Sequence, residues 1–148
     1  MKEKLKELKE IYRLERHEEG GWFSEVYTSP FSKDGRALAG SIYFLLDGSE
    51  ISHFHQIDCD EIWYYHEGCG MKITVITEKR EKLEYFLGRD VQNYMVVIPK
   101  GSIFAAENLD KESFTFVSCV TVPKFLYEGF RLVSKDEIEY PDAKYLAY

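Results

Sequence analysis

Residues 52–68 read SHFHQIDCDEIWYYHEG, a run in which two histidines, a glutamate and a glycine stand among strand-forming residues. Alternate side chains of a β-strand point to the same face, so the pattern predicts that His53 and His55 project together. If Glu61 opens the next strand, its carboxylate faces the same space. The sequence therefore predicts a cluster of imidazole and carboxyl groups between two neighbouring strands.

This cluster suits two kinds of chemistry, and the residues leave both open. Two imidazoles and one carboxylate can bind a divalent metal such as Zn, Fe, Mn or Ni, with His53, His55 and Glu61 as the ligands. The same groups can instead transfer protons without a metal. In that interpretation His55 is a general base with a pKa near its ordinary value, and Tyr65 or Tyr43 is the acid.

The composition favours a β-rich domain that holds a ligand. The chain has 148 residues, enough for a single domain, residues 1–148, with a sizeable core. Aromatic residues make up 16% of it, and the 11 tyrosines and 10 phenylalanines suit strands better than a helical bundle. The net charge of −7 argues against nucleic-acid binding, which needs a positive stripe.

Membrane insertion and disulfide bonding are not expected either. No run of eighteen apolar residues occurs, and the charged N-terminal residues do not resemble a signal peptide, so we expect a cytoplasmic protein. The three cysteines, Cys59, Cys69 and Cys119, are odd in number and form no CxxC pair. Each is interpreted as a small hydrophobic residue, and no disulfide framework is expected.

Periodicity predicts one helix followed by many short strands. Residues 2–12 place Leu5, Leu8 and Ile11 on one face among Lys and Glu, which is typical of an amphipathic helix. Strand-forming runs follow, separated by Gly, Pro and Asp turns. The predicted strands are 22–28, 37–46, 51–56, 61–66, 71–77, 83–87, 94–98, 103–106 and 114–122.

These elements indicate an all-β fold with a closed antiparallel arrangement. A jelly roll fits better than an up-and-down barrel, although periodicity leaves the strand order open. Near the C-terminus, Ser134 is a candidate N-cap and Glu137 completes a capping box, which predicts a minor helical piece there.

Two motifs resemble those of the cupin superfamily. In the first, Gly48 precedes the His-x-His pair, Glu61 follows after five residues, one more than usual, and Gly68 closes the run. The second motif resembles residues 99–108, PKGSIFAAEN. Phe104 stands there where the family has a histidine as its fourth metal ligand.

More narrowly, the chain is similar to a branch of small single-domain cupins known as a domain of unknown function. The matching pieces lie at residues 17–25, 41–46, 55–63, 87–90 and 120–125, so that the likeness covers about 12–133. The chain departs from the branch where Glu18 replaces proline, Ser24 replaces arginine and Lys124 replaces glycine. The changes at Ser24 and Lys124 are expected near the pocket, so substrate preference does not carry over.

The resemblance implies a double-stranded β-helix, the cupin jelly roll, with one internal pocket. It also implies a homodimer, since exposed strands of a small jelly roll need covering. Relatives include sugar-nucleotide epimerases, sugar-phosphate isomerases, metal-dependent dioxygenases and seed storage proteins without catalysis. The fold alone therefore does not fix the function.

We expect the chain to bind a small polar metabolite, sugar-derived or carboxylated, in its interior. The leading hypothesis is an isomerase or epimerase in which His55 is the base and Glu61 and a tyrosine assist it. The alternatives are a metal-dependent cupin enzyme and a non-catalytic binding or structural cupin, the last favoured by Phe104. The candidate ligand-binding residues are Trp63, Phe104, Asn108 and Glu25.

Structural roles are the alternative for several of these residues. His53 could flank the strand at the surface, and His17 could equally be a structural hydrogen bonder or a pocket residue. His66 has the opposite strand parity from Glu61 and is expected to point outward. Trp63, Tyr65, Tyr43 and Phe104 could simply fill a small barrel. Glu61 is different, because a carboxylate inside an apolar barrel is costly unless it is paired.

Overall fold

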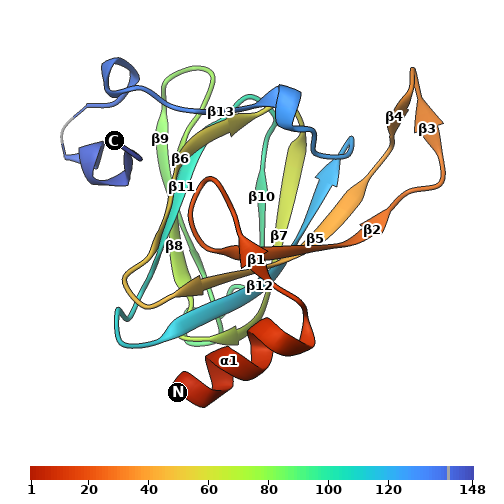
Figure 1. The fold of residues 1–148 in the computed structure, drawn as a ribbon. Coiled ribbons are helices and arrows are strands. Elements are labelled where there is room, and N and C mark those ends of the chain that lie inside the picture. The colour runs from red at the N-terminus through yellow and green to blue at the C-terminus, as the bar shows by residue number, and fades with distance from the viewer. Residues whose placement is uncertain (140) are drawn as a thin grey trace.

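The computed structural model describes residues 1–139 and 141–148, and its main feature is a pair of antiparallel β-sheets that face each other (Figure 1). The strands of one sheet are β1 (Glu15–Arg16), β2 (Trp22–Thr28), β5 (Gly40–Asp47), β7 (Asp60–Gly68), β10 (Met95–Ile98) and β12 (Phe114–Val122). The strands of the other are β6 (Ile51–Ile57), β8 (Met71–Ile76), β9 (Lys82–Leu87), β11 (Ile103–Asn108) and β13 (Phe130–Leu132).

The strand order is that of a jelly roll. The six-stranded sheet runs β1-β2-β5-β12-β7-β10 and the five-stranded sheet runs β13-β6-β11-β8-β9. Strands that follow one another in the chain, such as β5 and β6 or β7 and β8, lie in opposite sheets. An up-and-down barrel would pair them directly, so the predicted all-β jelly roll is confirmed.

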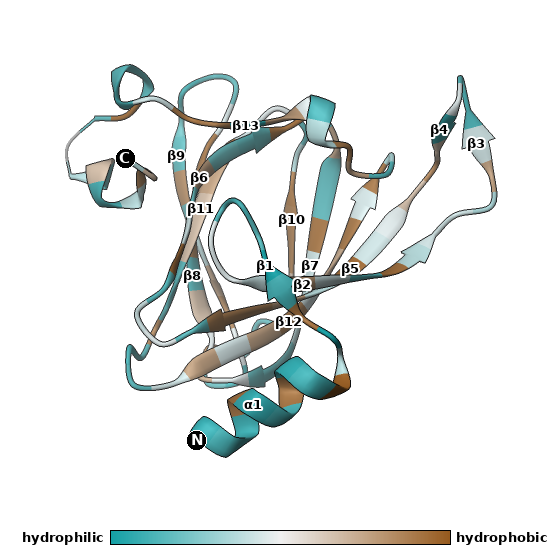
Figure 2. Cartoon of the chain, viewed as in Figure 1, coloured by the Kyte–Doolittle hydropathy of each residue, from teal (hydrophilic) through white to brown (hydrophobic). Residues whose placement is uncertain are grey.

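The N-terminal helix α1 (Lys2–Ile11) covers the outer face of the six-stranded sheet (Figure 1). Leu5 and Leu8 are buried there against Leu45, Phe114 and Phe116. The rest of the helix is hydrophilic, and Figure 2 shows it mostly teal with isolated brown positions. The predicted amphipathic helix is therefore confirmed, one residue shorter at its C-terminal end. Within the described parts of the chain, no helix has the length and apolarity needed to cross a membrane.

Two regions differ from the predicted strand pattern. The strand expected at 37–46 is divided into β4 (Arg36–Ala37) and β5, and β4 pairs with β3 (Ser32–Lys33) in a hairpin. This hairpin projects away from the two sheets (Figure 1). The capping box of Ser134 and Glu137 is present, but it opens a 3₁₀ turn, η2 (Lys135–Glu137). The other 3₁₀ turns are η1 (Tyr127–Gly129) and η3 (Asp142–Tyr145).

The hydrophobic core fills most of the space between the sheets. Two of the three cysteines, Cys59 and Cys119, lie in it as free thiols, and Cys69 is half-buried, in agreement with their expected role as small hydrophobic residues. Burial of this apolar surface is the main stabilising contribution to such a fold. Other core side chains are Phe44, Leu46, Trp63, Met71, Ile73, Val75, Phe104 and Val117.

The loop between β1 and β2, residues 17–21, folds inward and attaches to β6. The His17 N–H donates to the Gly21 carbonyl at 3.0 Å, and the His53 N–H of β6 donates to the Glu19 carbonyl at 2.7 Å. Gly20 has φ +108°, and a Cβ at this position would overlap the Ile51 carbonyl oxygen. Only glycine fits so close to β6 in this left-handed conformation.

We predict that Gly20→Ala destabilises the protein much more than Gly35→Ala. Gly35 also has a positive φ, +81°, but no atom lies within 4 Å of the point that a Cβ would occupy there. Gly35→Ala should therefore cost only the conformational penalty of about 1–2 kcal/mol. Gly20→Ala should lose roughly 1–3 kcal/mol more, because the loop must move off β6. Urea unfolding of both variants measures the difference, and equal losses would contradict the close fit.

Candidate functional site

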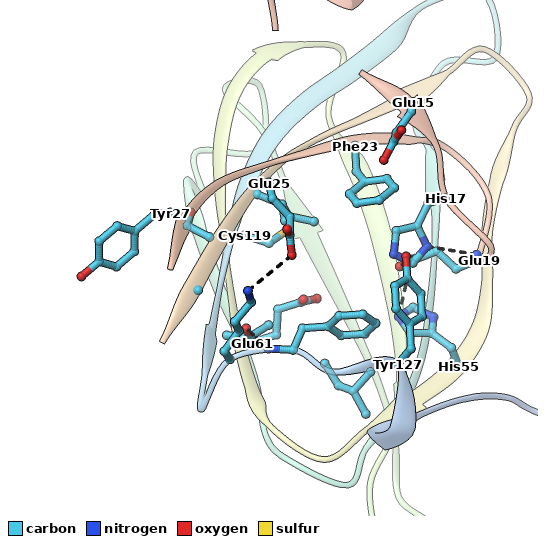
Figure 3. A pocket seen from close by; sticks show the side chains of 17 residues that line it. Glu15, His17, Glu19, Phe23, Glu25, Tyr27, His55, Glu61, Cys119 and Tyr127 are labelled. Carbon is cyan, nitrogen blue, oxygen red and sulfur yellow. Dashed lines mark hydrogen bonds and ion pairs between the residues drawn. The ribbon is translucent and has the colours of Figure 1, made fainter. Parts of the chain in front are cut away.

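A cavity of about 260 Å³ lies between the sheets beneath the inward loop (Figure 3). It is lined by side chains from β1, β2, β5, β6, β7 and β12 and from residues 124–127, just before and within η1. The carboxyl and ammonium groups of its lining belong to Glu15, Glu19, Glu25, Glu61 and Lys124. Its ring-bearing lining consists of His17, Phe23, Tyr27, His55, Phe125 and Tyr127.

His55 is held as a base at the wall of the cavity. Its Nδ1 lies 2.7 Å from the His53 carbonyl oxygen, which only accepts, so Nδ1 carries a proton and Nε2 is the basic nitrogen. Nε2 lies 3.4 Å from Glu19 Oε2. Burial lowers the pKa of His55, and the nearby Glu19 charge only partly opposes this. The separation would allow an ion pair, but desolvation favours the neutral imidazole at neutral pH.

Glu19 lies next to His55 and is fixed from several sides. Its Oε2 accepts a hydrogen bond from the Ser52 hydroxyl. Its own N–H donates to His17 Nδ1 at 3.1 Å, so this histidine nitrogen carries no proton. The 3.4 Å approach of Glu19 Oε1 to the same nitrogen is therefore not an ion pair. Glu19 can instead stabilise positive charge that develops on His55.

Glu61 is a protonated acid in the same cavity. It is only 8% exposed, and Trp63 Nε1 donates to its Oε1 at 2.6 Å. Burial, reinforced by the charge of Glu19, raises the pKa of Glu61 to about 8, although the Trp63 hydrogen bond opposes the shift. At neutral pH the carboxyl group therefore carries its proton.

A β-bulge separates the two histidines of the His-x-His pair. His55 pairs with Phe104 of β11, whereas Ser52 pairs with Ala106, so β6 contains one extra residue between them. Ser52 and His55, three residues apart, consequently both reach Glu19. His53 Nδ1 lies 2.8 Å from the Glu19 main-chain oxygen, and His53 does not line the cavity. The expectation that His53 and His55 project together is wrong, because the bulge breaks the strand alternation.

The expected metal ligands are not assembled. In residues 1–139 and 141–148, no group of three or more His, Cys, Asp or Glu side chains is placed to hold a metal ion. His53 is bound to main chain, and Glu61 is bound to Trp63. The ring of Phe104, where the family has its fourth ligand, lies 4.1 Å from that of His55. His53, His55 and Glu61 therefore do not fit the divalent metal that the motif implies.

The two candidate tyrosines lie outside the cavity. The Tyr65 hydroxyl donates to the Gly68 carbonyl at 2.6 Å. Tyr43 lies on the outer face of its sheet, where its ring packs 4.6 Å from that of Tyr12 under the helix. His66 is on this outer face as well, as expected, 2.8 Å from Ser118 Oγ. Neither Tyr65 nor Tyr43 can serve as the acid partner of His55.

Three of the four candidate ligand-binding residues are structural. Trp63 and Phe104 belong to the core, and neither they nor Asn108 line the cavity. The Asn108 amide donates to the carbonyls of Leu46 and Gly48 at 2.9 and 2.8 Å. An amide bound to two main-chain oxygens holds a turn in place and does not reach a ligand. The fourth candidate, Glu25, does line the cavity.

Several lining residues were given no functional role from the sequence. Glu19 lies in the HEEGG stretch, whose paired glycines indicate a tight turn but not its inward direction. Tyr127 comes from the C-terminal segment, and burial, with added effects of nearby carboxylates, raises the pKa of its hydroxyl. Lys124 does line the cavity, as expected. Ser24 does not, and its buried hydroxyl has no hydrogen-bond partner in the described chain.

Comparison with known proteins agrees with this architecture. The family model of the cupin superfamily (DUF985) matches residues 6–133. Protein SO0799 from Shewanella oneidensis is 34% identical with a TM-score of 0.83, and the match covers 88% of this chain and 85% of that one. A hypothetical protein from Leishmania major is 24% identical with a TM-score of 0.88, over 97% and 98% of the two chains.

A more distant similarity concerns the fold alone. Oxalate decarboxylase from Bacillus subtilis, which has Mn(II) centres, is 18% identical with a TM-score of 0.61. That match covers 78% of this chain but 28% of the enzyme. No match was found among the curated proteins. The family match over most of the sequence, together with the likeness to SO0799, shows that this chain belongs to the cupin superfamily.

Proposed function

We propose that this cupin binds a small polar carbonyl compound in its cavity and acts on it as an isomerase or epimerase by proton transfer. The observation that carries the proposal is that His55 and Glu61 line the same cavity. Burial lowers the pKa of His55 and raises the pKa of Glu61 to about 8. One cavity thus contains an unprotonated base and a protonated acid at the same neutral pH.

The chemistry follows from these protonation states. His55 Nε2 removes a proton from the carbon next to the carbonyl, and Glu61 donates its proton to the carbonyl oxygen. The imidazolium that forms is stabilised by the Glu19 carboxylate, 3.4 Å away. If the imidazolium returns its proton to the former carbonyl carbon while the Glu61 carboxylate takes the proton of the adjacent hydroxyl group, the substrate is isomerised. If a proton from solvent instead adds to the original carbon on its opposite face while Glu61 takes back the enol proton, the product is the epimer, and His55 releases its proton to solvent.

The charges in the cavity favour a sugar-derived substrate over a carboxylated one. Glu15, Glu19 and Glu25 line the cavity, and Lys124 is the single lysine or arginine among its described lining residues. A substrate carboxylate would be repelled by this excess of negative charge. Hydroxyl groups can instead donate hydrogen bonds to it.

We predict that both His55→Gln and Glu61→Gln lower the exchange of a substrate carbon-bound proton by about 10²–10⁴-fold. Both replacements keep the approximate volume, so the loss would report proton transfer and not packing. Aldoses and ketoses are incubated with the protein in D₂O, and deuterium incorporation is followed by NMR. The control is His66→Gln, on the outer face of the sheet, which should exchange at the wild-type rate. Wild-type exchange in the His55 variant would refute its role as the base.

The raised pKa of Glu61 predicts a pH-dependent stability. Below its ordinary value of 4.5 the group is protonated in both states, and its contribution is fully present. As the pH rises toward about 8, the unfolded chain ionises while the folded chain does not, so stability falls by up to about 1.4 kcal/mol per pH unit. Glu61→Gln should lack this loss in urea unfolding between these pH values. The exposed control Glu112→Gln should retain it, and a Glu61 variant that loses stability in parallel with wild type would contradict the shift.

A homodimer is the second part of the proposal. The outer face of the six-stranded sheet exposes Tyr64, Met95, Val97 and Val122 on strands β7, β10 and β12. Tyr64 pairs with Met95, so their side chains share a face, and β10 is the edge strand of the sheet. A second copy would cover this contiguous apolar surface and edge.

We predict that Val97→Glu shifts the protein from dimer to monomer in sedimentation velocity, because a charge would be buried in the interface. The matched control is Leu83→Glu, since Leu83 is a similarly exposed residue on the edge strand β9 of the other sheet. That variant should remain dimeric. A wild-type protein that sediments as a monomer at micromolar concentration would refute the dimer.

A further inference from the structure

Aromatic rings form part of the cavity wall. Phe23 and His17 have ring centroids 4.7 Å apart with their planes at 73°. On the other side, Phe125 and Tyr127 are 5.0 Å apart at 83°. His17 also lies 6.1 and 6.3 Å from Phe125 and Tyr127, respectively. All four residues line the cavity that Figure 3 shows.

Carboxylates lie close to the same rings. Glu15, Glu19 and Glu25 line the cavity, and in Figure 3 Glu15 lies beside Phe23. The nearest counter-charge, Lys124 Nζ, is 3.8 Å from Glu25 Oε1 and also donates to Thr28 Oγ1 at 2.9 Å. The described lining thus contains one ammonium group and the three carboxylates of Glu15, Glu19 and Glu25, so the cavity has an excess of negative charge.

Glu61 adds a polar group to the lining of the same cavity. Glu61 is 8% exposed, and its Oε1 accepts a hydrogen bond from Trp63. Among the described residues its second oxygen has no hydrogen-bond partner, and it is not one of the fully buried atoms that lack one, so it is open to the cavity. A ligand or water can hydrogen-bond to it there. The cavity thus offers a polar contact from Glu61 together with a wall of aromatic rings and carboxylates.

We propose that the cavity selects a ligand that carries an organic ammonium group, held between the rings of Phe23, Phe125 and Tyr127 and the carboxylates of Glu15 and Glu25. A cation is attracted both by the faces of aromatic rings and by the carboxylates beside them. A phosphate or carboxylate is repelled by the same groups. A neutral ligand gains neither attraction.

This inference rests on the proposed function in one respect. It makes the substrate of His55 and Glu61 a carbonyl compound with an amino substituent, such as an amino sugar. Recognition of the ammonium group does not itself require proton transfer, so the two proposals can fail separately.

The test compares probes that differ in charge. D-glucosamine is compared with D-glucose, and choline with its uncharged isostere 3,3-dimethylbutan-1-ol, by calorimetry or ligand-observed NMR. We expect the charged member of each pair to bind about tenfold more tightly at low salt. We also expect the preference to decrease as salt screens the carboxylates.

Variants assign the preference to the named side chains. Glu25→Gln and Tyr127→Leu change exposed residues at the opening, so their folding is not at risk, and each should reduce the preference several-fold. The exposed control Glu112→Gln should leave it unchanged. Equal binding of the charged and neutral probes, no binding of any probe, or an unchanged preference in both variants would overturn the inference.

The outcomes also separate this inference from the proposed function. A preference for the ammonium probes with no carbon-bound proton exchange contradicts the proposed reaction and supports the binding site. Exchange that is as fast for glucose as for glucosamine, without a binding preference, supports the reaction and overturns the ammonium site.

Discussion

The contact between Glu19 and strand β6 is the interaction on which the rest of the site depends. The main-chain oxygen of Glu19 accepts from the His53 N–H, and its carboxylate accepts from Ser52 and faces His55 Nε2. The same charge contributes to the raised pKa of Glu61 across the cavity. One residue from a loop of the six-stranded sheet thus acts on titratable groups of both sheets, although burial is the larger cause of both pKa shifts. Gly20 makes this possible, since a side chain there would hold the loop away from β6.

Much of the fold follows from local sequence. Strands β2 and β12 occupy the residues predicted for them, 22–28 and 114–122, because turn-forming residues bracket β-branched and aromatic runs. The strands β1 and β13 have only two and three residues. Their pairing partners β2 and β6 place them, and no local periodicity marks such short segments. The β3–β4 hairpin escapes prediction for the same reason.

The site is harder to predict from the sequence than the fold is. His55 and Glu61 could be predicted because titratable residues in strand-forming runs are costly to bury without a function. His53 is misassigned because alternation holds only in a regular strand, and the bulge in β6 follows from its pairing with β11. Glu19 reaches Ser52 and His55 across more than thirty residues of sequence. Contacts of this kind are properties of the folded chain.

The side chain of Lys124 lies at the opening of the cavity, at a position where this chain differs from the small cupins that it resembles. Its Cγ would lie 3.0 Å from a Cβ on Gly40, so the lysine stem is packed against β5 and the position of its ammonium group is restricted. That group lies near Glu25 at the opening of the cavity. The resemblance to the branch of small cupins implies a glycine at this position, which would remove the positive charge and the stem together. Lys124 therefore occupies space at the opening of this cavity and places one positive charge beside the Glu25 carboxylate.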